Sequence, residues 1–347
     1  MPALRIIWDT EDDCLSEEDV EDMNRFVELF MFHRNHEAPL DFCEIRMNEF
    51  DWEGPLPHID LWIQQALLSQ VRNLSVEVDS FNTGLCLSDT PLISKHLTRL
   101  KLVFVRLENK FLNFSSCPTL KSLWLTGCEI ATKKISSQSL QHLTIIESIF
   151  TRDTRTCISA PSLVWLQLTD NTTIPILENM PSLEEYGGSC SKDSCDNCDD
   201  KNDKIQGCLL LKGMSQAESL ELVAQPGSFI FKRDLMWCPT FSKLKTLLLN
   251  EWCVAINFDP LLCFLEHAPV LEKLTLQLRQ MPDNWVEPRG FYFYVPSDEP
   301  FASKNLKVIE IKCQQFDERV HQISKILSTY NIYLEQINIQ WSSKCSE

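Results

Sequence analysis

A short pattern of hydrophobic and polar positions recurs along the chain. The pattern spans six residues and reads apolar-x-x-apolar-x-apolar, as in "LKSLWL" at 120–125 and "LEKLTL" at 271–276. Its last four residues alternate, so one face of an extended segment is apolar and the other is polar or variable. Twelve copies, some of them weaker, begin at residues 42, 71, 97, 120, 140, 163, 183, 217, 244, 271, 306 and 334. The pattern predicts twelve β-strands of one repeating unit.

The spacing of these copies predicts how the strands assemble. Successive copies begin 20 to 35 residues apart. A strand that is apolar on one face cannot bury that face alone, whereas parallel stacking of many copies makes a continuous core. Most of the spacings are typical of leucine-rich repeats. We therefore expect an α/β leucine-rich-repeat solenoid, or horseshoe, with a parallel β-sheet on the concave face and irregular short helices outside.

The segments between the strands carry their own signals. Proline stands two residues before the first leucine of the pattern in "SSCPTL", "ISAPSL", "ENMPSL" and "EHAPVL". There it favours an extended entry into the strand and ends any preceding helix. Apolar residues at helical spacing predict outer helices at 259–269 and 319–330. Cys128 and Asn171 occupy the turn position where leucine-rich repeats place Cys or Asn.

The residues between the buried leucines point to the other face of the predicted sheet. Stacking at about 4.8 Å per strand would bring Trp124, Ile146 and Trp165 into one patch, with His142 beside them. Exposed aromatic patches often mark a contact surface. The patch is either such a surface or is covered by a loop or a terminal segment. The candidate residues for binding a protein partner are Trp124, Trp165, Ile146, His142, Arg99 and Lys101.

The N-terminal segment is strongly acidic. Nine acidic residues lie between Asp9 and Asp22, and Val20, Met23, Phe26, Val27 and Phe30 then recur at helical spacing. This predicts an acidic linker and a cap helix that covers the first repeat, and a docking site for a basic partner is the alternative. We expect residues 1–36 to form this cap segment, 37–290 the leucine-rich repeats and 291–347 C-terminal repeats.

One cysteine-rich stretch could bind a metal ion. Cys195 and Cys198 form a C-x-x-C pair, with Cys190 five residues before it and Cys208 ten after it. C-x-x-C is a usual half of a zinc site, but Cys190 and Cys208 do not form the second such pair. Five aspartates within the stretch favour a mobile acidic loop. A zinc site and a redox-active pair remain alternatives, and no metal or cofactor is expected.

Composition narrows the class of function. The net charge of −17 argues against nucleic-acid partners and anionic membranes, because phosphates would be repelled. The 15 cysteines lie scattered, and neither a secretion signal nor a membrane-length apolar run is present in the sequence. These features predict a reducing compartment, the cytoplasm or the nucleus. No catalytic sequence motif is present, so we interpret His142 as a contact residue and expect no enzyme.

Several long blocks resemble a known plant family. The blocks include "PLDFCEIRMNEF" (39–50), "SKHLTRLKLVFVRLENKFLNFSSCPTLKSLWLTGCEI" (94–130) and "HAPVLEKLTLQL" (267–278). They resemble F-box/leucine-rich-repeat/FBD-type proteins, most closely those of grasses. Residues 302–339 resemble the family's C-terminal FBD region, so 291–347 is expected to be FBD-like. The resemblance covers nearly the whole chain.

This resemblance implies a function. It implies the substrate-binding part of an F-box receptor of an SCF-type ubiquitin ligase, with a protein partner on the concave face. No segment matches the F-box, and "MPALRIIWD" (1–9) resembles the segment that follows it, so we expect the F-box itself to be absent from this chain. A Skp-type adaptor and a cullin are expected only where an F-box is present. An F-box-less scaffold or decoy is the alternative.

Overall fold

In the computed structural model the chain folds into two compact units. The first unit comprises Met1–Leu163 and Asn171–Thr173, and the second comprises Val164–Asp170 and Ile174–Glu347. The described residues are 2–8, 17–33, 39–47, 57–79, 85–151, 155–189, 208–224, 231–254, 258–279, 305–314, 318–329 and 337–341.

Among the described residues, the main sheet is parallel and its 13 strands follow one another in chain order. In the first unit they are β1 (Ala3–Trp8), β2 (Phe42–Met47), β3 (Asn73–Val78), β5 (Arg99–Val103), β7 (Ser122–Thr126) and β10 (His142–Ile146). In the second unit they are β13 (Trp165–Thr169), β15 (Glu185–Ser189), β16 (Ser219–Ala224), β17 (Thr246–Asn250), β18 (Lys273–Leu278), β19 (Val308–Cys313) and β20 (Ile337–Trp341). Each of the twelve predicted copies coincides with one of these strands, so the α/β leucine-rich-repeat solenoid is confirmed.

The alternation of the hexad explains the core. Leu123 and Leu125 of β7 are fully buried, as are Leu143 and Ile145, their register partners on β10. The residues between them point to the opposite face, because successive side chains of a strand alternate. Each strand thus contributes one rung of leucine-type side chains to a core shared with its neighbours.

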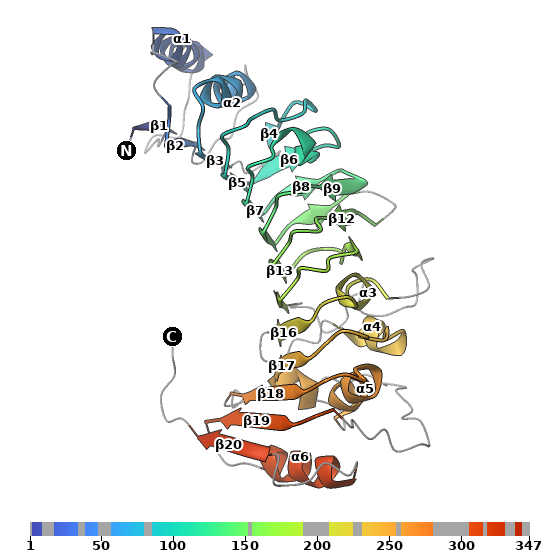
Figure 1. The fold of residues 1–347 in the computed structure, drawn as a ribbon. Helices are drawn as coiled ribbons and strands as arrows, with labels where there is room; N and C mark the ends of the chain where they lie inside the picture. Colours follow the sequence, from blue (N-terminus) through green and yellow to red (C-terminus); the bar gives the residue numbers. More distant parts are fainter. Residues whose placement is uncertain are drawn as a thin grey trace. The chain divides into compact units, whose positions relative to one another are not determined.

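The outer layer differs between stretches of the chain (Figure 1). Helices α1 (Glu17–His33) and α2 (Ile59–Leu68) lie beside β1–β3. Short strands replace helices in the rest of the first unit: β4 (Leu85–Cys86), β6 (Val105–Leu107), β8 (Glu129–Ile130), β9 (Lys134–Ser136), β11 (Ile149–Phe150) and β12 (Cys157–Ser159), with the 3₁₀ turn η1 (Phe114–Ser116). The second unit has β14 (Ile176–Glu178), α3 (Leu211–Met214), α4 (Lys232–Met236), η2 (Glu251–Val254), α5 (Asp259–His267) and α6 (Glu318–Thr329). Helices α5 and α6 match the two predicted outer helices.

The prolines before the strands form turns. In "SSCPTL" the Leu120 N–H donates to the Cys117 carbonyl oxygen at 3.1 Å, and in "EHAPVL" the Leu271 N–H donates to the Ala268 oxygen at 3.2 Å. Proline therefore occupies the second position of a four-residue turn, where its fixed φ is favourable. The sequence interpretation of an extended entry is refined accordingly: the proline sets a turn, and the strand begins after it.

Cys128 and Asn171 hold the turns that follow two strands. The Cys128 thiol is fully buried and lies 3.4 Å from the Leu102 carbonyl oxygen of the preceding repeat. The Asn171 side chain donates to the Ile145 oxygen and accepts from the Ser148 N–H, both at 2.9 Å. Asn250, one residue beyond its last leucine, makes a similar pair of bonds to the main chain of Ala224. The side chains of Cys128, Asn171 and Asn250 therefore each bond to the main chain of the preceding repeat. We call these three side chains the polar ladder.

We expect the Asn171→Ala variant to lose about 1–2 kcal/mol of unfolding free energy, because one main-chain oxygen and one N–H lose their partner. Urea denaturation monitored by circular dichroism would measure this. Asn305→Ala is the control, since its exposed side chain makes a single bond to the Pro269 oxygen. An equal cost for both variants would contradict a special role of the ladder.

Helix α1 confirms the predicted helix but buries a different set of its apolar residues. Val20, Met23, Val27 and Met31 are at most 8% exposed, whereas Phe26 is 70% exposed. The buried residues follow one helical stripe, and Phe26 and Phe30 lie on the next stripe. Strand β1 lies within the predicted cap segment, precedes this helix and pairs with β2, which belongs to the predicted repeats. The predicted boundaries at 36 and 290 stay predictions.

Candidate functional site

The face of the sheet opposite the leucines is the candidate site, and register defines it. In the first unit one row of side chains crosses six adjacent strands, and we call it the Trp124 row. Its members are Arg5, Glu44, Ser75, Lys101, Trp124 and Thr144. Parallel neighbours in register lie about 4.8 Å apart. The sequence prediction that Lys101 and Trp124 share a face is therefore realised in adjacent positions.

The predicted contact residues of the first unit differ in exposure. Arg99, Lys101 and His142 are exposed, whereas Trp124 and Ile146 are half-buried. Thr144, the register partner of Trp124, is only 3% exposed, and its Oγ1 has no hydrogen-bond partner. Trp124 itself presents part of its ring to solvent.

Trp165 lies in the second unit, in a row of its own. The Trp165 row crosses seven strands, and its members are Trp165, Glu185, Glu221, Leu248, Thr275, Glu310 and Asn338. Trp165 itself is half-buried. Because Trp165 belongs to a different unit from Trp124 and Ile146, the single patch expected from the sequence stays a prediction.

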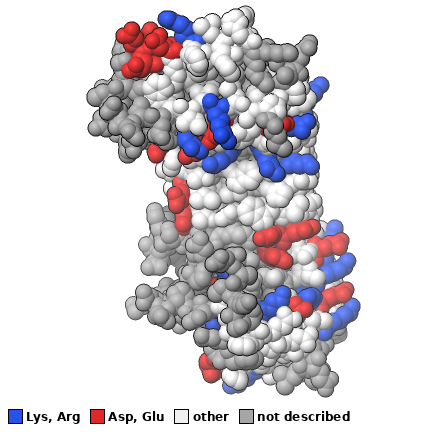
Figure 2. All heavy atoms as spheres, turned by 90° about the vertical axis from the view of Figure 1, so that its left-hand side faces the viewer, with Lys and Arg blue, Asp and Glu red and all other residues white. Residues whose placement is uncertain are grey.

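Besides the predicted Arg99 and Lys101, this face carries charged residues that the sequence prediction did not include. Glu44 lies 3.3 Å from Arg5 Nε and 2.6 Å from Arg46 Nη2, and Glu77 lies 3.6 Å from Lys101 Nζ and 3.8 Å from Arg46 Nε. Figure 2 looks onto the sheet face, where basic and acidic side chains lie interspersed over the first unit. Such exposed pairs contribute little stability. They do make Lys101 part of a charge network and not a free cation.

The Trp165 row carries an acidic pair. Glu185 and Glu221 are register partners on adjacent strands, and both are exposed. Burial, followed by the Glu185 carboxylate, raises the pKa of Glu221. Two carboxylates in neighbouring positions repel each other and favour a cationic group opposite them. Alternation alone places each glutamate on this face, but only the register reveals that they are neighbours.

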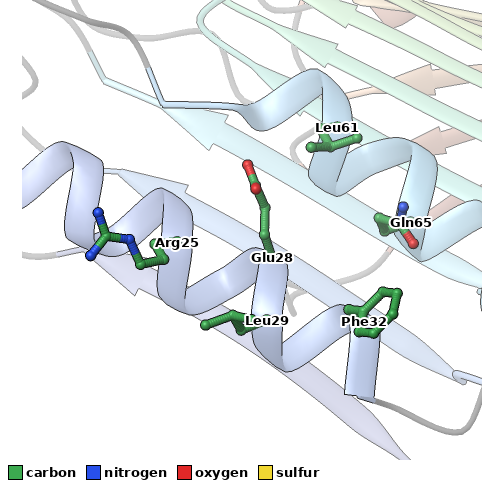
Figure 3. Close-up of a pocket in the computed structure, with 6 residues that line it drawn as sticks. All are labelled: Arg25, Glu28, Leu29, Phe32, Leu61 and Gln65. Carbon is green, nitrogen blue, oxygen red and sulfur yellow. The ribbon is translucent and has the colours of Figure 1, made fainter.

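The N-terminal end of the first unit contains two apolar grooves. One has a volume of about 540 Å³ between β1 and α1, and includes Ile7 and Phe30. The other, about 370 Å³, lies between α1 and α2 (Figure 3) and is lined by Arg25, Glu28, Leu29, Phe32, Leu61 and Gln65. Phe32 is 76% exposed. This end of the unit is therefore a second apolar surface, which the cap-helix prediction did not include.

The predicted cysteine cluster is only partly within the described residues. Cys190, Cys195 and Cys198 lie outside them. The Cys208 sulfur lies 3.0 Å from the Lys212 N–H, and burial, followed by the charge of Asp234, raises the pKa of this thiol. A raised pKa opposes the thiolate form that metal binding requires. The structure thus gives no support from Cys208 for the zinc alternative.

Comparisons with known proteins agree with this repeat architecture. Residues 44–186 match the family model "FBD-associated F-box protein At5g56370, LRR repeats". The chain is 22% identical over 263 residues to "MEIOTIC F-BOX protein MOF" of Oryza sativa subsp. japonica, an alignment that covers 70% of this chain and 54% of the rice protein. The chain therefore spans about half the length of this curated relative.

No solved structure matches the chain significantly. None of the described helices has the length and apolar character needed to cross a membrane. The matched model describes leucine-rich repeats, a class that serves protein interaction and generally lacks catalysis. The repeats, their register and the two matches lead to one conclusion: residues 44–186 are similar to the leucine-rich repeats of FBD-associated F-box proteins.

Proposed function

We propose that this chain is a protein-recognition module that holds a protein partner on the leucine-free face of its sheet. The observation that carries the proposal is the Trp124 row, in which a half-buried indole lies between the exposed Lys101 and the covered Thr144. Tryptophan is among the residues that contribute most to protein interfaces. The resemblance to F-box receptors adds the finer proposal that the partner is a ubiquitin-ligase substrate.

The same face supports binding over catalysis. Within the described residues, His142 is exposed and no hydrogen bond orients its ring. A general base needs a nucleophile or substrate within reach and a group that orients it. The acidic pair of Glu185 and Glu221 instead offers complementarity to a basic group of the partner. We place the protein in the cytoplasm or nucleus, in line with the many cysteines that stand outside disulfides among the described residues.

Affinity capture from plant extract, followed by cross-linking mass spectrometry, tests the proposal. Cross-links from captured proteins are expected on Lys101 and on other lysines of the sheet face. Cross-links confined to the outer elements, such as Lys212 of α3, would contradict a role for the sheet face.

The same captures separate the ligase receptor from the scaffold or decoy. A Skp-type adaptor and a cullin recovered together with the partner would support the receptor. A partner recovered while added Skp-type adaptor stays unbound would support the scaffold or decoy. Purified adaptor, titrated against the chain in the absence of partner, provides the direct affinity for this comparison.

A further inference from the structure

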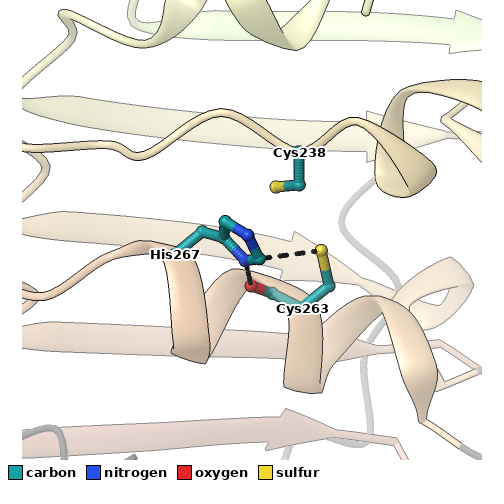
Figure 4. Close-up of side chains that lie close together, drawn as sticks. All are labelled: Cys238, Cys263 and His267. Atoms are coloured by element: carbon teal, nitrogen blue, oxygen red, sulfur yellow. Dashed lines mark hydrogen bonds between the residues drawn. The ribbon is translucent and has the colours of Figure 1, made fainter. Parts of the chain in front are cut away.

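Three side chains of the second unit form a compact cluster of metal-ligating groups. Cys238 follows α4, and Cys263 and His267 belong to α5. One ligand atom from each of the three lies within 4.8 Å of the other two, a combination found nowhere else among the described residues. In Figure 4 the Cys238 sulfur and the imidazole point toward one another, and the Cys263 sulfur points into the same space. The cluster lies apart from the sheet face.

The fold explains why these residues meet. Cys263 and His267 are four residues apart on a nine-residue helix, so both project from one helix face. Cys238 comes from the connection between β16 and β17, whereas α5 lies in the connection between β17 and β18. The cluster therefore joins the outer layers of two successive repeats. The C-x-x-x-H spacing at 263–267 was a sequence signal, but nothing in the sequence indicated that Cys238 lies opposite it.

The hydrogen bonds of His267 prepare its ring for a metal ion. Its Nδ1 lies 2.9 Å from the main-chain oxygen of Cys263 (Figure 4). Because a carbonyl oxygen only accepts, Nδ1 carries the proton and Nε2 has the free lone pair in the neutral ring. Metal-binding histidines are usually held by such a bond from the second ring nitrogen. The bond fixes the tautomer and the ring orientation together.

The two cysteine sulfurs can approach one cation together. They lie within 4.8 Å of each other and of the ligand nitrogen of His267. The thiolate is the form of cysteine that binds metal ions, and a cation between two sulfurs stabilises both as thiolates.

We propose that Cys238, Cys263 and His267 bind one zinc-type cation that links two successive repeats. Thiolate and imidazole ligands suit zinc, and three protein ligands leave a fourth position for water or an added ligand. Two sulfurs on a tetrahedral zinc ion lie roughly 3.8 Å apart. The observed limit of 4.8 Å means that the ligands need to close by only about 1 Å. Rotation of Cys238, which is half-buried, supplies that adjustment.

Zinc titration of the purified full chain tests this proposal. The protein is stripped of metal and kept reduced with a phosphine, and bound Zn²⁺ is then measured by equilibrium dialysis and elemental analysis. The Cys238→Ser and His267→Gln variants should each lose one equivalent of zinc or bind it more than about tenfold more weakly. Wild-type protein should also melt at a higher temperature with zinc than with a chelator, whereas these variants should not.

The other candidate cysteines provide the matched control. A Cys195→Ser/Cys198→Ser variant removes the C-x-x-C pair and should keep the equivalent of zinc that the Cys238→Ser variant loses. The reverse result, or no zinc uptake by the wild-type chain, would overturn the proposal. A Cys238–Cys263 disulfide that persists under the phosphine and excludes zinc would also overturn it. Cys263→Ser is less informative, because its side chain is fully buried and the variant can fail to fold.

Discussion

Replacing Asp234 with alanine is expected to lower the free energy of unfolding of the second unit by about 3 kcal/mol or more. The Asp234 carboxylate is 3% exposed and accepts three main-chain N–H bonds, from Leu209 at 2.8 Å, Leu210 at 2.7 Å and Leu211 at 2.9 Å. These N–H groups lie at the start of α3 in the preceding repeat. Each buried donor left without a partner costs about 1–3 kcal/mol.

Two further variants serve as comparisons for the loss of unfolding free energy in Asp234→Ala. Asp234→Asn keeps one acceptor oxygen and should fall between alanine and wild type. Asp60 also accepts an N–H and a hydroxyl bond from Ser88, but in an exposed setting, so Asp60→Ala should cost less than about 1 kcal/mol. Chemical denaturation measures the cost, and hydrogen exchange at 208–214 shows whether it arises locally. Equal costs for Asp234→Ala and Asp60→Ala would refute the argument.

The strands of this fold could be predicted because one physical constraint repeats. Each strand needs an apolar face, and the hexad states that need directly, so that "FCEIRM" coincides with β2 to the residue. The same pattern was overlooked in "ALRIIW", which forms β1 and pairs with β2. Helix α2 also had a signal, since Ile59, Trp62, Ile63 and Ala66 are buried at helical spacing. The sequence therefore contains enough information to predict both β1 and α2.

The outer layer of the first unit could not be predicted in the same way. Strands such as β8 (Glu129–Ile130) contain two residues, and two residues carry no period. Their formation depends on pairing with β6 and β11 from other repeats. The expected short helices therefore occur beside β1–β3 and in the second unit, while short parallel strands line the stretch between them.

The candidate site, too, could be predicted only in part. Alternation assigned Trp124 and Lys101 to the face opposite the core, because that property is local to each strand. Which residues become neighbours depends on register and on contacts between repeats, as for Glu77 beside Lys101. The cluster of Cys238 with α5 has the same origin. Sequence periodicity thus predicts on which face of the sheet a side chain lies. Which side chains of different repeats become neighbours is seen only in the three-dimensional structure.

The second large effect is expected in partner binding by the Trp124→Ala variant. Its free energy of unfolding should fall by only about 1 kcal/mol, since the indole is half-buried and lies outside the leucine core. Capture of the protein partner should weaken by about 2 kcal/mol or more, roughly thirtyfold, if the indole anchors the interface. Denaturation and quantitative capture of the same cross-linked partner measure the two quantities. Trp165→Ala tests the second unit's row in the same way.

Trp237 provides the matched control for an exposed indole. It is 50% exposed and follows α4 in the outer layer, away from the sheet face. Trp237→Ala should leave capture unchanged. A loss of about 3–5 kcal/mol in unfolding for Trp124→Ala would instead identify a core side chain. A small cost in unfolding together with a large cost in binding would identify the Trp124 indole as part of the partner-binding surface.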